Sequence, residues 1–111
     1  MEVRHNIQLN ENGLYATKSY NKDDLIHELV GEIFDEPTRE TIRISDNEHI
    51  HDMFGMYMNH SFEPSCYIKE NKVMAIKDIY PNDELTFNYN DNEVDMACPF
   101  EVDGILVAGK Q

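Results

Sequence analysis

The chain alternates between short apolar runs and turn-forming residues, a pattern typical of β-strands. Residues 41–44 alternate polar and apolar side chains with a period of two, as a strand with one buried face does. Residues 14–17 follow the turn signal Asn12-Gly13, and residues 25–30 follow a polar cluster. Each of these runs predicts a short strand.

The second half of the chain continues this pattern. Residues 66–69 and 72–76 flank Glu70-Asn71, which predicts a tight β-hairpin. Turn-forming residues at 81–83 precede a further apolar run at 84–89, which predicts another strand.

One segment has the period of a helix instead. Ser45 and Glu48 have the spacing of a capping box, and Gly55 lowers helix stability by up to about 1 kcal/mol. Apolar residues follow at positions i, i+3, i+4 and i+7, namely Ile50, Met53, Phe54 and Tyr57. We expect one short helix of about three turns before Asn59. Many short strands with one helix predict a β-rich α+β domain.

Length and charge limit the classes of function. The 111 residues suffice for one domain, and 22 acidic against 9 basic residues give a net charge of −13. Such a charge disfavours binding to phosphate backbones and to anionic membrane surfaces. It favours a cationic ligand or a basic peptide, or else serves only to keep the protein soluble.

The chain contains no apolar run of membrane-spanning length, and its first residues lack the apolar region of a signal peptide. Cys66 and Cys98 form no Cys-x-x-Cys pair. We therefore expect an intracellular protein with free thiols, cytoplasmic if the source is bacterial.

Three other constellations fall short of a known site. His49 and His51 with His60 lack a spacing that completes a zinc pattern, and they diverge if residues 49 and 51 are helical. The asparagines at 88, 90 and 92 lack the glycine and the bidentate acid of a calcium loop. Cys66 with His60 has no third group to orient a nucleophile and base. We expect no bound metal.

Three segments, taken in order, resemble the SET-domain protein-lysine methyltransferases. Asn12-Gly13-Leu14-Tyr15-Ala16 is similar to the family's Gly-x-Gly-(Leu/Val)-(Phe/Tyr)-Ala entry, and residues 57–66 contain its Asn-His-Ser block as Asn59-His60-Ser61. Residues 78–89 are similar to its Ile-x-x-Gly-Glu-Glu-Leu-Thr-x-x-Tyr ending, and residues 28–32 to its Gly-Glu strand. Each motif is weak alone, but their order and spacing are specific.

The resemblance implies a SET-domain, β-clip-like fold of short curled sheets with a knot-like C-terminal segment. It implies one domain over residues 1–111, with a core at about 4–91 and a cysteine-poor tail at 92–111. It further implies S-adenosylmethionine as the methyl donor and a protein lysine as the acceptor, entering through a narrow channel from the opposite face. Histone tails and lysine-rich ribosomal segments are candidate partners, and the oligomeric state stays open.

The resemblance also assigns roles to individual residues. Tyr89 matches the catalytic tyrosine, whose phenol orients the lysine amine. Phe87 matches the position that sets how many methyl groups are added. The residues that would bind the donor are Asn12, Gly13, Leu14, Asn59 and His60, and those that would line the lysine channel are Phe87, Tyr57 and Phe100.

The sequence departs from the family pattern at three places. Glu11 stands where the entry motif has its first glycine, and Phe62 replaces the cysteine that follows Asn-His-Ser. The tail lacks the three-cysteine zinc cluster that often completes the lysine channel, so Phe100 and residues 105–107 either close the site by packing or leave it half open. The alternative to an enzyme is therefore a non-catalytic SET-fold module that binds a peptide or partner.

Overall fold

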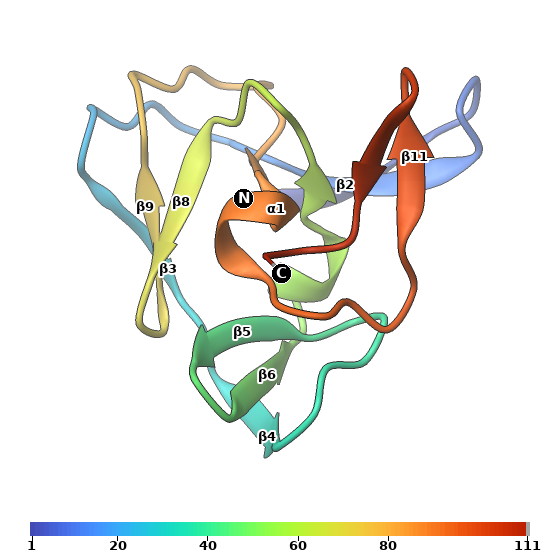
Figure 1. Ribbon diagram of the computed structural model, residues 1–111. Helices are drawn as coiled ribbons and strands as arrows, with labels where there is room; N and C mark the ends of the chain where they lie inside the picture. Colours follow the sequence, from blue (N-terminus) through green and yellow to red (C-terminus); the bar gives the residue numbers. More distant parts are fainter. Residues whose placement is uncertain (111) are drawn as a thin grey trace.

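The computed structural model describes residues 1–110 as a set of small β-sheets with two short helical turns (Figure 1). The elements in chain order are β1 (Glu2–Asn6), β2 (Glu11–Tyr15), β3 (Leu25–Glu28), β4 (Gly31–Phe34), β5 (Ile42–Ser45), β6 (Glu48–Asp52), the 3-10 helix η1 (Gly55–Tyr57), β7 (Asn59–His60), β8 (Cys66–Lys69), β9 (Lys72–Ala75), β10 (Thr86–Phe87), α1 (Tyr89–Asn92), β11 (Phe100–Val102) and β12 (Ile105–Val107).

Some strands pair with the next strand in the sequence, whereas β3–β9, β4–β6 and β7–β10 join strands that are not consecutive. Strands β1–β2 and β11–β12 are antiparallel hairpins, and β4-β6-β5 forms a three-stranded sheet. In the sheet β3-β9-β8, the early strand β3 pairs with β9. Strands β7 and β10 pair in parallel, with Asn59 beside Thr86 and His60 beside Phe87. The β-rich fold of small sheets is confirmed.

The predicted hairpin around Glu70-Asn71 is confirmed by β8 and β9, which pair from Cys66–Ala75 to Lys69–Lys72. Glu70 has a φ of 55°, the left-handed conformation that such a tight turn requires. The alternating segment at 41–44 is likewise a strand, β5.

The predicted helix beginning at Ser45 is wrong in its extent. Strand β6 occupies Glu48–Asp52, and only the three residues of η1 before Asn59 are helical. Ser45 Oγ donates to Glu48 Oε1 at 2.6 Å across the β5–β6 turn instead of capping a helix. Ile50 is buried between strand partners, so sheet pairing overrides the helical period.

Two of the histidines considered as metal ligands, His49 and His51, lie on strand β6 and not on a helix. His49 is buried, and His51 Nε2 lies 3.1 Å from Glu40 Oε2. Within residues 1–110, no group of three or more His, Cys, Asp or Glu side chains is arranged to hold a metal ion.

The strand predicted at 84–89 is also shorter than expected. β10 covers only Thr86–Phe87, and Tyr89 begins α1. Asn88 is the N-cap of that turn, since its side chain accepts a hydrogen bond from the Asn90 backbone N–H at 2.9 Å.

The core lies where the small sheets meet around the buried residues Ile79 and 85–87. Leu85 N–H donates to the Leu14 carbonyl at 2.7 Å, and Ile79 and Tyr20 exchange two backbone hydrogen bonds. The largest fully buried side chains are Leu14, Leu29, Ile79, Leu85, Val73, Val107 and Cys66. None of the described helices is long and apolar enough to cross a membrane.

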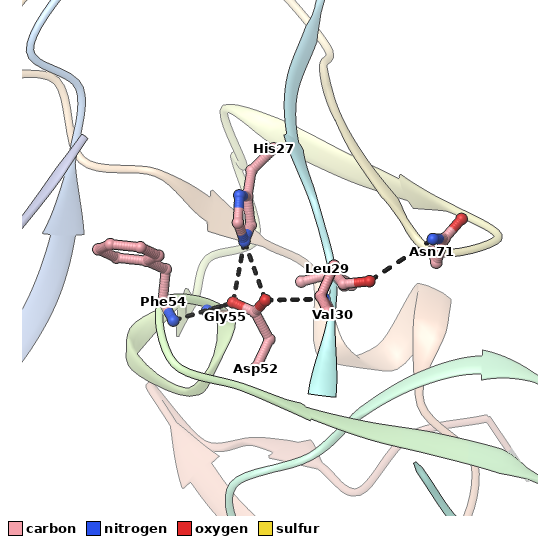
Figure 2. Close-up of polar contacts among 7 residues, drawn as sticks. All are labelled: His27, Leu29, Val30, Asp52, Phe54, Gly55 and Asn71. Atoms are coloured by element: carbon pink, nitrogen blue, oxygen red, sulfur yellow. Dashed lines mark hydrogen bonds and ion pairs between the residues drawn. The ribbon is translucent and has the colours of Figure 1, made fainter. Parts of the chain in front are cut away.

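Asp52 joins two sheets through a buried carboxylate (Figure 2). One oxygen accepts from the backbone N–H groups of Phe54 and Gly55 at 2.9 and 2.7 Å. The other accepts from the Val30 N–H at 2.9 Å, and His27 Nε2 lies within 3.0 Å of both oxygens. These hydrogen bonds lower the pKa of Asp52 although burial opposes them. The carboxylate therefore fixes η1 against β3 and β4.

The C-terminal tail packs on α1. Asn90 Oδ1 accepts from the N–H groups of Ala108 and Gly109 at 3.2 and 3.1 Å, and Asn90 Nδ2 donates to the Leu106 carbonyl at 3.1 Å. Gly109 has a φ of +88°, and a Cβ there would lie 2.6 Å from the Glu93 carbonyl oxygen. Glycine at this position lets the tail reach α1.

Candidate active site

A depression of about 1160 Å³ lies between the β1–β2 hairpin, the 37–41 loop, β7 and the tail. Its walls therefore come from segments at both ends of the chain, around α1 (Figure 1). Six of the residues assigned from sequence line it, namely Asn12, Asn59, His60, Phe87, Tyr89 and Phe100.

The Asn59 side chain occupies the part of the depression nearest β2. Its Nδ2 donates to the Asn12 carbonyl oxygen at 2.9 Å and to Glu84 Oε2 at 2.9 Å. One asparagine thus connects the β2 strand to the segment before β10.

His60 is linked to Tyr89 by the parallel pairing of β7 with β10. The Tyr89 backbone N–H donates to His60 Nδ1 at 3.1 Å, so this nitrogen is unprotonated. Burial lowers the pKa of His60, which favours the neutral ring with its proton on Nε2. Nε2 is buried and has no hydrogen-bond partner within residues 1–110. A bound ligand is one way to satisfy such a donor.

Aromatic rings surround His60. The centroids of Phe62, Tyr89 and Phe100 lie 4.4, 5.3 and 6.0 Å from that of His60, each in an edge-on arrangement. Phe87 lies 4.7 Å from Tyr89. Phe100 comes from the tail, so the tail contributes a wall to this cluster by packing alone.

The Tyr89 ring is half-buried in this cluster and packs against the core. Its hydroxyl donates to the Met58 carbonyl oxygen at 2.5 Å. Burial and the carboxylates of Glu93, Glu11 and Glu84 raise the pKa of Tyr89 well above its ordinary value. The phenol is neutral at physiological pH, and because its proton is engaged, its oxygen lone pairs are available to an N–H donor.

Comparison with known proteins identifies the family. The SET-domain family matches residues 11–90, the span that contains all three motifs. The chain belongs to the SET-domain family. This family in general uses S-adenosylmethionine.

Two known proteins are similar to this SET domain. A histone-lysine N-methyltransferase of Neurospora crassa, named as specific for H3 lysine-4, is 34% identical over 104 aligned positions. The alignment covers 69% of this chain but only 8% of that relative, so the chain spans a small part of its length. The crystal structure of a candidate histone methyltransferase from Plasmodium falciparum matches with a TM-score of 0.58 and 19% identity. The match covers 79% of this chain and 94% of the Plasmodium falciparum chain, and the two chains share the fold.

The side chains of this SET domain fit the family's methyl donor. His60 Nε2 is a buried donor that lacks a partner among the described residues, and Asn59 keeps one free acceptor, Oδ1, because both of its N–H bonds are used within the protein. The depression is also large enough for a ligand of nucleoside size.

Three residues assigned from sequence are absent from the lining of the depression. Leu14 is 1% exposed in the core, and its carbonyl accepts from Leu85. Gly13 lies against the Glu84 carboxylate. Tyr57 is half-buried in η1, where it packs against the core.

Sequence reasoning assigned no role to two acidic residues of this SET domain. Glu84 belongs to the Glu-Leu-Thr motif, but its contact with Asn59 depends on tertiary structure. Glu93 is only 5% exposed and lines the depression; its Oε2 accepts from the Arg43 N–H at 3.0 Å and from Asn92 Nδ2 at 2.7 Å. Burial raises the pKa of Glu93. No local sequence signal marks it.

The alternative of a thiol nucleophile loses support. Cys66 is buried in the core, and burial raises the pKa of its thiol to about 11. At neutral pH almost no thiolate forms, so Cys66 is a packing residue of this SET domain.

Proposed function

We propose that this SET domain transfers methyl groups from S-adenosylmethionine to lysine side chains of a basic protein or peptide. The observation that carries the proposal is the junction at β7 and β10. There, His60 accepts from the Tyr89 backbone while the Tyr89 phenol, bound to the Met58 carbonyl, lines the depression. Three of the expected cofactor-binding residues, the expected catalytic residue and Phe87 therefore meet within one depression, namely Asn12, Asn59, His60, Tyr89 and Phe87.

Tyr89 orients the acceptor amine. Its hydroxyl proton is engaged by Met58, so the phenol oxygen accepts an N–H from a neutral lysine amine. This contact leaves the amine lone pair free to point along the line of attack. Alignment of the two reacting atoms within about 3–3.5 Å supplies much of the rate of such a transfer.

The aromatic cluster excludes water from the acceptor. Phe87, Phe100 and the Tyr89 ring provide an apolar lining that disfavours the charged form of a lysine entering it. Phe87 presents no hydroxyl, so space remains for an amine that already carries a methyl group, and we expect transfer beyond the monomethyl stage.

The donor would be held by Asn59 and His60, with Asn12 at the edge. When bound, S-adenosylmethionine supplies an electrophilic methyl group on a positively charged sulfur. Asn59 Oδ1 offers an acceptor and His60 Nε2 offers a donor, two polar groups of opposite character for one ligand.

The substrate class follows from charge. Glu11, Glu40 and Glu63 line the depression within a chain of net charge −13. A basic segment is drawn to such a surface, whereas nucleic acid is repelled. Histone tails are the first candidates, because the Neurospora crassa relative is named for a histone lysine.

The test is transfer of methyl groups to lysine-rich peptides. The protein is incubated with S-adenosylmethionine and peptides from histone tails and ribosomal proteins, and products are followed by mass spectrometry. Methylation by the wild type and its loss in Tyr89→Phe support the proposal. Donor binding without transfer to any peptide supports the non-catalytic module instead.

A further inference from the structure

We propose that Glu84 is a positioning residue that fixes the orientation of the Asn59 side-chain amide. The inference rests on the proposed function, since it concerns how the same depression selects its ligand. Through Asn59, Glu84 determines that the depression offers an acceptor, and not a donor, at this point.

The amide orientation follows from the acceptors around it. Asn59 Nδ2 lies 2.9 Å from Glu84 Oε2 and 2.9 Å from the Asn12 carbonyl oxygen. A carboxylate and a carbonyl can only accept, so the nitrogen must face them. A flipped amide would place Oδ1 against two oxygens. Both N–H bonds are therefore used, and Oδ1 is the polar atom left for a ligand.

The backbone around Glu84 is held by several contacts. Glu84 bridges to Tyr15 of β2, and its own carbonyl accepts from Ser65 Oγ at 2.8 Å. The next residue, Leu85, donates to the Leu14 carbonyl at 2.7 Å. These contacts fix the backbone at Glu84, so the side chain starts from a position within reach of Asn59.

Gly13 supplies the space that this contact needs. A Cβ at position 13 would lie 2.9 Å from Glu84 Oε2 and 3.3 Å from Asn59 Nδ2. The first distance is shorter than real contacts allow, and the Glu84 carboxylate is the end of a flexible side chain that can move away. An alanine here would fold but would displace the carboxylate from the amide. Glycine is therefore required for steric reasons that involve Glu84.

The arrangement predicts selectivity for a ligand group that donates hydrogen bonds. The ammonium group at the amino-acid end of the methyl donor is such a group. In a desamino analogue a hydrogen atom replaces it, and this hydrogen cannot donate a hydrogen bond. Loss of a hydrogen bond that involves a charged group reduces affinity by about tenfold or more.

The experiment measures this selectivity directly. Calorimetry gives dissociation constants for S-adenosylhomocysteine and for its desamino analogue, which lacks only the ammonium group. We expect the wild type to bind S-adenosylhomocysteine about tenfold more tightly than the analogue, and Glu84→Met to bind both about equally. Glu84→Gln retains an acceptor of the same shape and should restore most of the selectivity, which a purely electrostatic role for Glu84 would not allow.

Two further variants separate positioning from other effects. Gly13→Ala should reduce the selectivity in the wild type and change it little in the Glu84→Met background, because both substitutions break the same contact. Glu32→Met removes an exposed carboxylate outside the depression and should leave the selectivity unchanged. If Glu84→Met does not fold, Gly13→Ala alone carries the test.

The outcomes distinguish the two proposals. A wild type that binds no S-adenosylhomocysteine overturns the proposed function and this inference with it. A wild type that binds it, while Glu84→Met or Gly13→Ala keeps the full selectivity, overturns the role of Glu84 and leaves the proposed function intact.

Discussion

The Asp52 carboxylate should be one of the largest single contributors to stability in this chain. It accepts from three backbone N–H groups, those of Val30, Phe54 and Gly55, and from His27 (Figure 2). Removing one partner of a hydrogen bond to a charged group leaves the other partner desolvated and unpaired. Replacement by alanine would do this to several groups at once.

The magnitude follows from these contacts. Each buried donor left without a partner costs about 1–3 kcal/mol, and water reaches some of them in the variant, so Asp52→Ala should lower the free energy of unfolding by about 3–5 kcal/mol. Asp52→Asn keeps one acceptor oxygen and should lose about 2–3 kcal/mol. A domain of this size has a total stability of only about 5–15 kcal/mol. Asp52→Ala should therefore remove a large part of the stability of the domain.

The pKa shift adds a pH dependence of known sign. The folded-state pKa of Asp52 lies below its ordinary value, so its contribution is complete above the unfolded pKa near 4 and is lost as pH falls through the folded pKa. Wild-type stability should therefore decline between about pH 5 and pH 2, in part through Asp52. Asp52→Asn cannot titrate and should show a shallower decline.

Urea unfolding followed by circular dichroism from pH 7 to pH 3 measures both effects. Asp46→Asn is the matched control, because Asp46 is 96% exposed and pairs with Arg43 alone among residues 1–110, and it should change stability by less than about 0.5 kcal/mol. Equal stabilities of wild type and Asp52→Asn at pH 7, or parallel declines toward pH 3, would refute this reasoning.

The remaining predictions concern the proposed activity. Tyr89→Phe should retain donor binding by calorimetry but lower methyl transfer by about two orders of magnitude, because it removes one polar group at the reacting centre; full activity would exclude this role. Phe87→Tyr should accumulate monomethyl product in a mass-spectrometric time course, because the new hydroxyl occupies space beside Tyr89; a product distribution equal to that of the wild type would contradict this. Asn59→Ala should weaken donor binding by about 1–3 kcal/mol in a folded protein, and unchanged affinity would refute its assignment. Association with a basic peptide, followed by stopped flow, should slow as salt rises, and a rate independent of salt would show that the acidic surface does not attract substrate.

The fold was predictable where local signals and pairing agree. Glu70-Asn71 turns the chain between two β-forming runs, and the β8–β9 hairpin follows. The helix expected from Ser45 failed because Ser45 and Glu48 contact each other across a hairpin, and because Ile50 gains more from two strand neighbours than from a helical face. Capping-box spacing and apolar period are local quantities, and sheet pairing is not.

The candidate site was predictable only as a set of residues. The motifs that contain Asn59 and Tyr89 give the family, yet the hydrogen bond from Tyr89 to the Met58 carbonyl depends on the parallel pairing of β7 with β10. Glu93 enters the depression because α1 turns it inward and the Arg43 N–H accommodates its carboxylate. Contacts of this kind arise from tertiary packing and leave no trace in spacing.

The parallel pairing of β7 with β10 also affects how the protein folds. Strand β7 must wait for a partner that lies beyond the β8–β9 hairpin, and β2 likewise waits for Glu84 and Leu85. Closing such long loops costs entropy before any contact forms, which slows folding. During synthesis, β3 and β7 leave the ribosome before their partner strands β9 and β10. The depression should therefore assemble in one late cooperative step, and a nascent chain that ends before α1 should lack the proposed donor site.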